Sequence, residues 1–322
     1  MAPPRFVALV APWVFVAACG GEPSRAGLEE PIRVRNGVFR EGELPGTPPS
    51  DAGTDVTPSG PALTPVETVG TILTRGQSAH AILGRASPTA WSVGVRFVGA
   101  GTGWWMVPVG GADPSFNNEV TWQLSTDLGY DLPTGLRAVR LVAIDASGRG
   151  GAQRDLRVCV VPPVPDNLHA CDPSLAPPDT VVSLAWDNDA DLDLVVVTPE
   201  GKVVSARQPT TALSDGGMVD RAALSDPSTG VLDRNAGAAC SRDRIRRENL
   251  VWQGAPRPGV YRVYANLFDA CRETAVRFRL SVWRRAEDGH PRETLRRDGM
   301  LGALAANGGG RLGTFVTDLA LP

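Results

Sequence analysis

The segment TVVSLAWDNDADLDLVVVTPEGKVV, residues 180–204, decides the fold of the second half of the chain. Two apolar runs rich in valine flank an acidic stretch, and a Pro-Glu-Gly-Lys turn signal follows the second run at residues 199–202. Short apolar runs of β-branched residues bounded by Gly and Pro are typical of strands. The segment therefore predicts a strand, an acidic corner, a second strand and a hairpin turn.

Further strands are predicted downstream of this segment. Alternation of polar and apolar residues over 260–268, after Pro258-Gly259, predicts one strand, and residues 275–283 and 312–321 predict two more. A long irregular region, about 207–249, separates them from the first pair, and no stretch has the period of a long helix. Residues 180–322 are therefore expected to form a jelly-roll-like β-sandwich.

The middle of the chain, residues 66–162, also predicts strands. Trp91, Val93, Val95 and Phe97 alternate with smaller or polar residues, and 118–125 and 136–145 alternate in the same way. The stretch GLRAVRLVAIDASGRGGAQRDLRVCVV, residues 135–161, resembles the last two strands of an immunoglobulin-like or fibronectin-type domain. The fold class expected for the chain is all-β, an immunoglobulin-like sandwich followed by a jelly-roll-like one.

Two segments have the composition of connections. Residues 19–65 are rich in Pro, Gly, Ser and Thr, which predicts a disordered tether because such a segment buries little apolar surface. Within it, residues 32–39 contain an Asn-Gly turn signal and are expected either to form a small hairpin or to stay disordered. Residues 163–179 are rich in proline and are expected to link the two sandwiches.

The N-terminus has the features of an export signal. Arg5 precedes an uncharged apolar stretch, residues 6–16, which is too short to span a bilayer, and Val-Ala-Ala-Cys follows at 16–19. The segment resembles a bacterial lipoprotein signal, which implies that residues 1–18 are removed and that Cys19 is acylated and anchors the chain in the membrane. Gly20 is not the aspartate of inner-membrane retention, so the resemblance implies an outer membrane lipoprotein. The alternative is an ordinary cleaved signal with an incidental cysteine.

Four further cysteines, an even number, predict disulfides in an exported protein. Three connectivities exist, and we favour Cys159–Cys171 and Cys240–Cys271 because each pair then lies within one expected domain. The second bridge closes a loop of about 30 residues, worth about 3 kcal/mol in loop-closure entropy. A metal site is the rival interpretation, but the sequence has neither a CxxC spacing nor a nearby histidine partner.

The acidic corner carries four aspartates at alternate positions, which on an extended chain share one face and repel each other. Calcium prefers such oxygen ligands, although the EF-hand pattern is absent because Leu192 and Thr198 stand at its glycine and glutamate positions. A second polar cluster follows near residue 235. The expected ligands of a structural calcium ion are Asp187, Asp189, Asp191, Asp193, Asp233 and Asn235.

The alternative to calcium is charge pairing within the protein. Four arginines stand among these acidic residues, and guanidinium groups pair with carboxylates through two parallel hydrogen bonds. In that case the acidic corner is neutralised without metal. The arginines are Arg242, Arg244, Arg246 and Arg247.

Three pieces of the second half together resemble an extracytoplasmic β-sandwich domain of unknown function found in bacterial lipoproteins: LAWDNDADLDLVVVTPEGK, GVLDRNAGAACSRDRIRRENLVW and PGVYRVYANLFDACRETAVRFRLSV. The first is also similar to the start of pre-peptidase C-terminal domains. The resemblance supports the Cys240–Cys271 pairing and implies that Asp191, Asp193, Asp233 and Glu248 belong to the pattern of the family. Arg234 departs from it, because an acidic residue is expected there. No activity follows from the resemblance.

The composition excludes some functions and leaves others open. A net charge of −3 offers no basic field for nucleic acid, and the three histidines, His80, His169 and His290, are not in an HExxH motif. No GxSxG nucleophile elbow is present. One of Trp104 and Trp105 is expected to be exposed for a sugar or a partner, the alternative being that it packs under a loop.

The expected function is therefore a non-catalytic, lipid-anchored interaction module of the cell envelope, with a polysaccharide or an envelope protein as partner. A structural spacer in an envelope assembly is one alternative. A hydrolase or an accessory to one is the other, and it rests on the pre-peptidase similarity alone.

Overall fold

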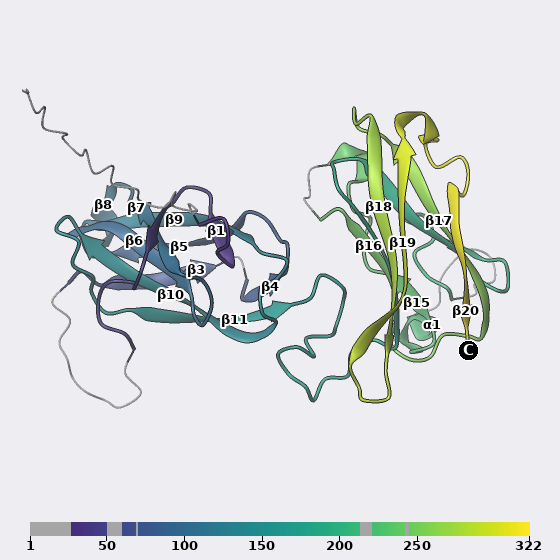
Figure 1. The fold of residues 1–322 in the computed structure, drawn as a ribbon, viewed down its shortest axis with the longest axis horizontal. Helices are drawn as coiled ribbons and strands as arrows, with labels where there is room; N and C mark the ends of the chain where they lie inside the picture. Colours follow the sequence, from purple (N-terminus) through teal and green to yellow (C-terminus); the bar gives the residue numbers. More distant parts are fainter. Residues whose placement is uncertain (1–26, 50–59, 69, 213–220, 242–244) are drawn as a thin grey trace, which may run out of the picture.

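The computed structural model describes residues 27–49, 60–68, 70–212, 221–241 and 245–322, and in this part the chain forms two β-sandwiches (Figure 1). The first has sheet orders β1-β9-β5-β3, with β8 beside β9, and β2-β7-β6-β10-β11-β4. Its strands are β1 (Ile32–Val34), β2 (Val38–Glu41), β3 (Leu63–Thr68), β4 (Ile72–Thr74), β5 (His80–Ala86), β6 (Ala90–Phe97), β7 (Gly103–Pro108), β8 (Ala112–Asp113), β9 (Glu119–Leu128), β10 (Gly135–Asp145) and β11 (Arg154–Val161).

The second sandwich has sheet orders β15-β16-β12-β18-β19 and β14-β13-β17-β20, and all of its pairings are antiparallel. Its strands are β12 (Thr180–Trp186), β13 (Asp191–Val197), β14 (Val203–Val204), β15 (Gly230–Leu232), β16 (Arg247–Trp252), β17 (Gly259–Asp269), β18 (Ala275–Arg285), β19 (Pro291–Gly302) and β20 (Thr314–Leu321). The helical elements are α1 (Arg221–Ser225) and the 3-10 turns η1 (Pro114–Phe116), η2 (Ala238–Cys240) and η3 (Ala303–Ala305). None of the helices in the described residues is long and apolar enough to cross a membrane.

Alternation along the strands builds one apolar core in each sandwich. In β13, Leu192, Leu194 and Val196 point into the second core, where they meet Val182 and Leu250 of the facing sheet. In the first sandwich the predicted strand at 91–97 is confirmed as β6, with its alternate residues 93, 95 and 97 buried in the core. The all-β class and both sandwiches are thus as the alternation predicted.

The first sandwich begins earlier than expected, because part of the segment predicted as a disordered tether, residues 19–65, is built into it. The Asn-Gly signal at 36–37 does not close a hairpin: β1 pairs with β9 in one sheet, whereas β2 pairs with β7 in the other. Leu44 is buried on Val142 and Ile144. The signal peptide, residues 1–18, and Cys19 lie outside the described residues.

Replacing Ile32 by alanine tests whether the N-terminal segment belongs to the first sandwich. Ile32 is 2% exposed and packs in the first core, so the change is expected to lower the free energy of unfolding by about 2–4 kcal/mol. Leu28→Ala, at a side chain that is 68% exposed, is the control and should change little. Chemical denaturation followed by tryptophan fluorescence measures both. Equal, small effects would place β1 outside the folded unit.

Both predicted disulfides are confirmed. Cys159 and Cys171 are bonded, and so are Cys240 and Cys271, with sequence separations of 12 and 31 residues. Bridges of this kind form and persist in oxidising compartments outside the cytoplasm. The first bridge joins β11 of the first sandwich to the linker. The second bridge joins two loops of the second sandwich.

Candidate functional site

A cleft of about 1040 Å³ lies between the two sandwiches and the linker, and we call it the interdomain cleft. The first sandwich contributes Arg35, Tyr130 and the turn at residues 74–78. The linker contributes residues 162–168, and the second sandwich contributes the ends of β12 and β16 with the loops beside them. Figure 1 shows the two sandwiches and the linker that loops between them.

The linker that forms one wall of the cleft is attached to both sandwiches. Cys171 is bonded to Cys159 of β11 in the first sandwich. On the other side, Asn167 donates a hydrogen bond to the side chain of Gln253 at 2.8 Å, and Arg285 lies 3.6 Å from the carboxylate of the last linker residue. These contacts on both sides favour a defined cleft over a flexible connection.

Five guanidinium groups line the interdomain cleft, and they fall into two classes. Three are ion-paired, at 2.7–3.0 Å: Arg35 with Asp127, Arg234 with Asp233, and Arg246 with Asp189. The other two, Arg75 and Arg247, have no carboxylate within ion-pair distance in the part of the chain that the structure describes. Each sandwich therefore contributes to the cleft one guanidinium group without an ion pair in the described residues.

Arg247 is held in place by the sheet that carries it. It lies on β16 opposite Ala185 of β12, and its Nη1 donates to the Ser183 hydroxyl at 2.9 Å. Burial lowers the pKa of this guanidinium, although an arginine stays protonated at neutral pH. A partly buried cation without an ion-pair partner raises the free energy of the folded protein. An anionic ligand at this wall of the cleft would lower that cost.

Tyr130 supplies an open aromatic surface to the cleft. The side chain is 77% exposed, and one side of the ring lies against the backbone of Gly76. A Cβ on Gly76 would come within 2.3 Å of the ring, and Gly76 has a positive φ of 73°, so only glycine suits this position. Sequence reasoning missed Tyr130; an aromatic residue in a turn between two predicted strands was the signal that could have found it.

The aspartates predicted as calcium ligands have separate partners. The carboxylate of Asp187 accepts a hydrogen bond from the Arg277 backbone N–H at 3.1 Å, and Asp189 is paired with Arg246. Asp233 accepts from the backbone and side chain of Asn249, at 2.9 and 2.8 Å. Of the four arginines named in the alternative to calcium, Arg246 pairs with Asp189, whereas Arg247 has no ion pair in the described residues and Arg242 and Arg244 lie outside them. The arginine that pairs with Asp233 is Arg234, which the alternative did not name.

Asp191 and Asp193 alternate with the core residues of β13, yet they are only 3% and 7% exposed. Asp191 accepts from the Ala239 N–H at 2.9 Å, and Asp193 accepts from Asn266 at 3.5 Å. Burial, together with the nearby charge of Asp191, raises the pKa of Asp193 to about 6. Asn235 is exposed on the loop after β15. The six residues do not form one ligand shell, and calcium binding stays a prediction.

Glu248, implied by the family resemblance, joins the two sheets of the second sandwich. It is fully buried and points into the core layer, where it accepts hydrogen bonds from the Leu194 N–H at 2.7 Å and the Ala236 N–H at 3.1 Å. Strand β14 pairs with β13 only at Val196 and Val197, so the Leu194 N–H lies on a part of that strand edge without a strand partner. Glu248 accepts the hydrogen bond from this N–H. Burial raises the pKa of Glu248 to about 9.

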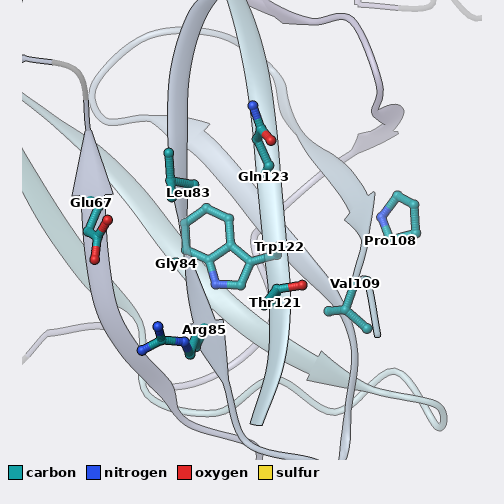
Figure 2. Close-up of a pocket in the computed structure, with 10 residues that line it drawn as sticks. Glu67, Leu83, Gly84, Arg85, Pro108, Val109, Thr121, Trp122 and Gln123 are labelled. Atoms are coloured by element: carbon teal, nitrogen blue, oxygen red, sulfur yellow. The ribbon is translucent and has the colours of Figure 1, made fainter. Parts of the chain in front are cut away.

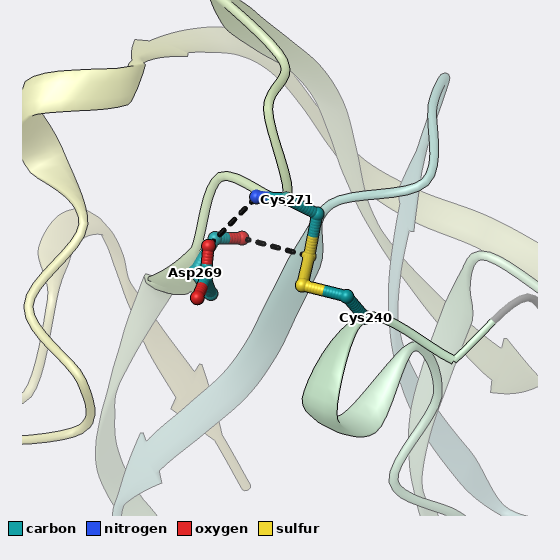
Figure 3. Close-up of side chains that lie close together, drawn as sticks. All are labelled: Cys240, Asp269 and Cys271. Atoms are coloured by element: carbon teal, nitrogen blue, oxygen red, sulfur yellow. Dashed lines mark hydrogen bonds between the residues drawn. A yellow bond between two sulfur atoms is a disulfide. The ribbon is translucent and has the colours of Figure 1, made fainter.

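One group of three side chains in the described residues has its ligand atoms close enough for a metal ion, and Figure 3 shows it: Cys240, Asp269 and Cys271. The two sulfur atoms are bonded to each other, so neither offers a thiolate. The Asp269 carboxylate accepts from the Cys271 N–H at 2.7 Å. The group is the closure of a disulfide loop, and it fits a structural role better than a metal site.

A smaller hollow of about 410 Å³ lies on the first sandwich, over β5 and β9 (Figure 2). Polar side chains, Glu67, Arg85 and Gln123, surround it, and Trp122 of β9 is buried in the first core with its indole N–H unpaired in the described structure. The guanidinium of Arg85 is occupied by stacking on Phe116, 3.5 Å from the ring centre. The hollow is smaller than the interdomain cleft and involves one sandwich only.

The two tryptophans weighed as ligand contacts are packed in the first sandwich. Trp105 is 4% exposed and its indole donates to the Ile32 carbonyl at 2.8 Å, while Trp104 lies partly buried against Leu44 and the residues around it. Opposite orientation of the two neighbours is as expected for a strand. The exposed aromatic residues of this sandwich are instead Trp91, Phe116 and Tyr130.

The three histidines have partners of a structural kind. His80 is buried and lies 3.0 Å from the Thr68 hydroxyl, and burial lowers its pKa. His169 of the linker and His290 of the β18–β19 hairpin are 3.3 Å apart. The second pair adds to the contacts that hold the linker against the second sandwich.

No protein-family model and no curated protein sequence matches the chain. Among solved structures, it is similar to the D1-D2 fragment of Rst, at 7% identity and a TM-score of 0.23, over 76% of this chain and 98% of that one. A chicken TCR has 9% identity and a TM-score of 0.21, over 74% and 99% of the two chains. Fibronectin(III)-like modules of Clostridium thermocellum CbhA have 10% identity and a TM-score of 0.18, over 74% and 94%. Likeness at this level says nothing about ligands or partners.

Proposed function

We propose that this chain is a non-catalytic binding module of the cell envelope, anchored through a lipid on Cys19, with the interdomain cleft as its binding site. The observation that carries the proposal is the cleft itself: about 1040 Å³, walled by both sandwiches and by a linker attached to each. Clefts between domains are common places for ligand sites. The two disulfides support a location outside the cytoplasm, where such bonds persist.

The chemistry of the described side chains favours binding over catalysis. The four cysteines at 159, 171, 240 and 271 are all in disulfides, and the rings of His169 and His290 lie 3.3 Å apart. The side chains that line the cleft include arginines and a tyrosine, which recognise polar and anionic ligands through hydrogen bonds and stacking.

Binding of the purified protein to envelope material tests this proposal. A chain that starts at Gly20 is applied to a glycan array and to envelope fractions, and we expect retention on at least one of them. Tyr130→Ala should reduce that retention, whereas Trp91→Ala, at a similarly exposed aromatic residue outside the cleft, should not. Absence of binding to both kinds of material would contradict the proposal.

A structural spacer is the second candidate, and the attachment of the linker to both sandwiches favours it. The two candidate functions predict different effects of the same substitutions. A spacer would tolerate Tyr130→Ala but lose its function when the Cys159–Cys171 bridge is removed. A binding module would be impaired by both changes, because the bridge also shapes the cleft.

Lipid anchoring makes a separate prediction. Cells that express the full chain and receive radiolabelled palmitate should label the protein, and outer membrane fractions should contain it. Cys19→Ala is expected to abolish the label and to release the chain from the membrane pellet, while Cys159→Ser should leave the label unchanged. Label that persists in Cys19→Ala would contradict the anchor.

A further inference from the structure

The two unpaired guanidinium groups of the interdomain cleft come from opposite sides. Arg75 lies in the turn after β4 of the first sandwich, and Arg247 lies on β16 of the second. Neither has a carboxylate within ion-pair distance in the described residues. A ligand that enters the cleft therefore meets one positive charge from each wall.

Within the described residues, the side chain of each group makes one hydrogen bond, which leaves most of its N–H donors unused. Arg75 donates from Nε to the Leu132 carbonyl, and Arg247 donates from Nη1 to the Ser183 hydroxyl. A guanidinium carries five N–H donors in a planar fork that matches the two oxygens of a carboxylate. Both arginines are half-buried, which limits the number of conformations they must lose on binding.

Three carboxylates also line the cleft, and each has hydrogen-bond or ion-pair partners of its own. Asp166 accepts hydrogen bonds from two backbone N–H groups of the linker, those of residues 168 and 170. Asp187 accepts from the backbone N–H of Arg277, and Asp189 is paired with Arg246. Among the cleft arginines of the described residues, Arg75 and Arg247 therefore keep N–H groups that no carboxylate engages.

Tyr130 adds a second kind of contact to the cleft. Its ring rests with one side on Gly76, and the side chain is 77% exposed. Tyr130 of the first sandwich and Arg247 of the second line the same cleft. An aromatic face and a cation in one cleft suit a ligand that has both an apolar C–H surface and a negative charge.

We infer that the interdomain cleft binds a carboxylate-bearing saccharide, such as a uronic acid unit of an acidic polysaccharide, with the carboxylate between Arg75 and Arg247 and a sugar ring against Tyr130. The inference rests on the proposed binding function and specifies its ligand class. A sugar ring offers C–H groups to the tyrosine, whereas an acidic peptide has no such ring, so the exposed Tyr130 favours the saccharide.

Calorimetric titration with oligogalacturonate tests the inference on the protein that starts at Gly20. Galacto-oligosaccharide of the same length is the neutral probe, and oligoglutamate is the acidic peptide probe. We expect Arg247→Gln and Arg75→Gln each to weaken oligogalacturonate binding about tenfold or more. Arg262→Gln removes the same charge from an exposed position on β17 and should leave the affinity within about twofold.

Several results would overturn the inference without touching the proposed function. Equal binding of the neutral oligosaccharide would show that the carboxylate is not recognised, and stronger binding of oligoglutamate would assign the cleft to an acidic peptide. Unchanged affinity in both cleft variants would place the saccharide site elsewhere. Binding of none of the three probes overturns the inference, while retention on envelope fractions still decides the proposed function separately.

Discussion

The free energy of unfolding of the second sandwich is expected to fall as the pH rises from about 5 to about 9. The cause is Glu248, whose carboxyl is fully buried between the sheets and whose pKa is raised by burial from 4.5 to about 9. Between these two values the folded chain holds a proton on Glu248 that the unfolded chain has released. The folded state binds more protons, so stability is highest below the unfolded pKa and declines with rising pH.

The size of this effect follows from proton linkage. One extra proton in the folded state gives a slope of about 1.4 kcal/mol per pH unit, so about 3 kcal/mol are lost between pH 5 and pH 7. Asp193, with a pKa raised from 3.8 to about 6, acts in the same direction over its own, more acidic window. Stability should therefore already decline below neutral pH.

Urea denaturation at pH 5, 6, 7 and 8 measures the slope. Glu248→Gln removes this titrating group, so its stability should be nearly flat between pH 7 and pH 8 and should keep only the Asp193 slope between pH 5 and pH 6. At pH 5 the variant should be less stable than the wild type, because an amide nitrogen cannot accept the hydrogen bond that one of the two backbone N–H groups donates. Glu287→Gln, at an exposed glutamate, should keep the wild-type slope. The same slope in Glu248→Gln and wild type would refute this account.

Removal of the Cys240–Cys271 bridge is expected to destabilise the second sandwich by about 3–4 kcal/mol. The two cysteines are 31 residues apart in the sequence, and their bond links the loop after β15 to the turn after β17. Figure 3 shows the disulfide bond between them. Reduction releases this loop in the unfolded chain, and the gain in entropy favours unfolding. The loop also carries Ala236 and Ala239, whose N–H groups bind Glu248 and Asp191, so the loss extends into the buried carboxylates.

Differential scanning calorimetry of the double variant Cys240→Ser, Cys271→Ser measures this loss as a lower midpoint of one transition. The matched control is Cys159→Ser, Cys171→Ser, which opens a bridge of 12 residues between the first sandwich and the linker. It should leave the transition of the second sandwich unchanged. A midpoint of the second sandwich that moves equally in both variants would contradict the assignment of each bridge to its own domain.

Predictions from local sequence succeeded where the strand was half-buried and regular. Residues 135–145 and 275–285 form strands within one or two residues of expectation, because alternation reports directly which face is buried. The charged β19 and the short β15 were missed. An edge strand needs one paired side only and tolerates charged residues on the other, so its pattern is weak.

The N-terminal segment shows a different limit. Its composition predicts disorder, yet β1 and β2 are ordered because each completes a sheet whose partner lies more than 60 residues away in the chain. Trp105 adds a hydrogen bond to the Ile32 carbonyl. Composition describes what a segment can bury alone, and these strands are stabilised by surface that the rest of the sandwich supplies.

The sequence by itself determined the all-β class and the two sandwiches, because alternation is a local property of the chain, whereas it only favoured the observed cysteine pairing among three possible ones. Only the tertiary structure decided that the alternating aspartates have separate partners, and that Arg75, Tyr130 and Arg247 meet at one cleft. These residues come from two domains and a linker. Their proximity depends on sheet register and on how the linker attaches, and no local pattern encodes either.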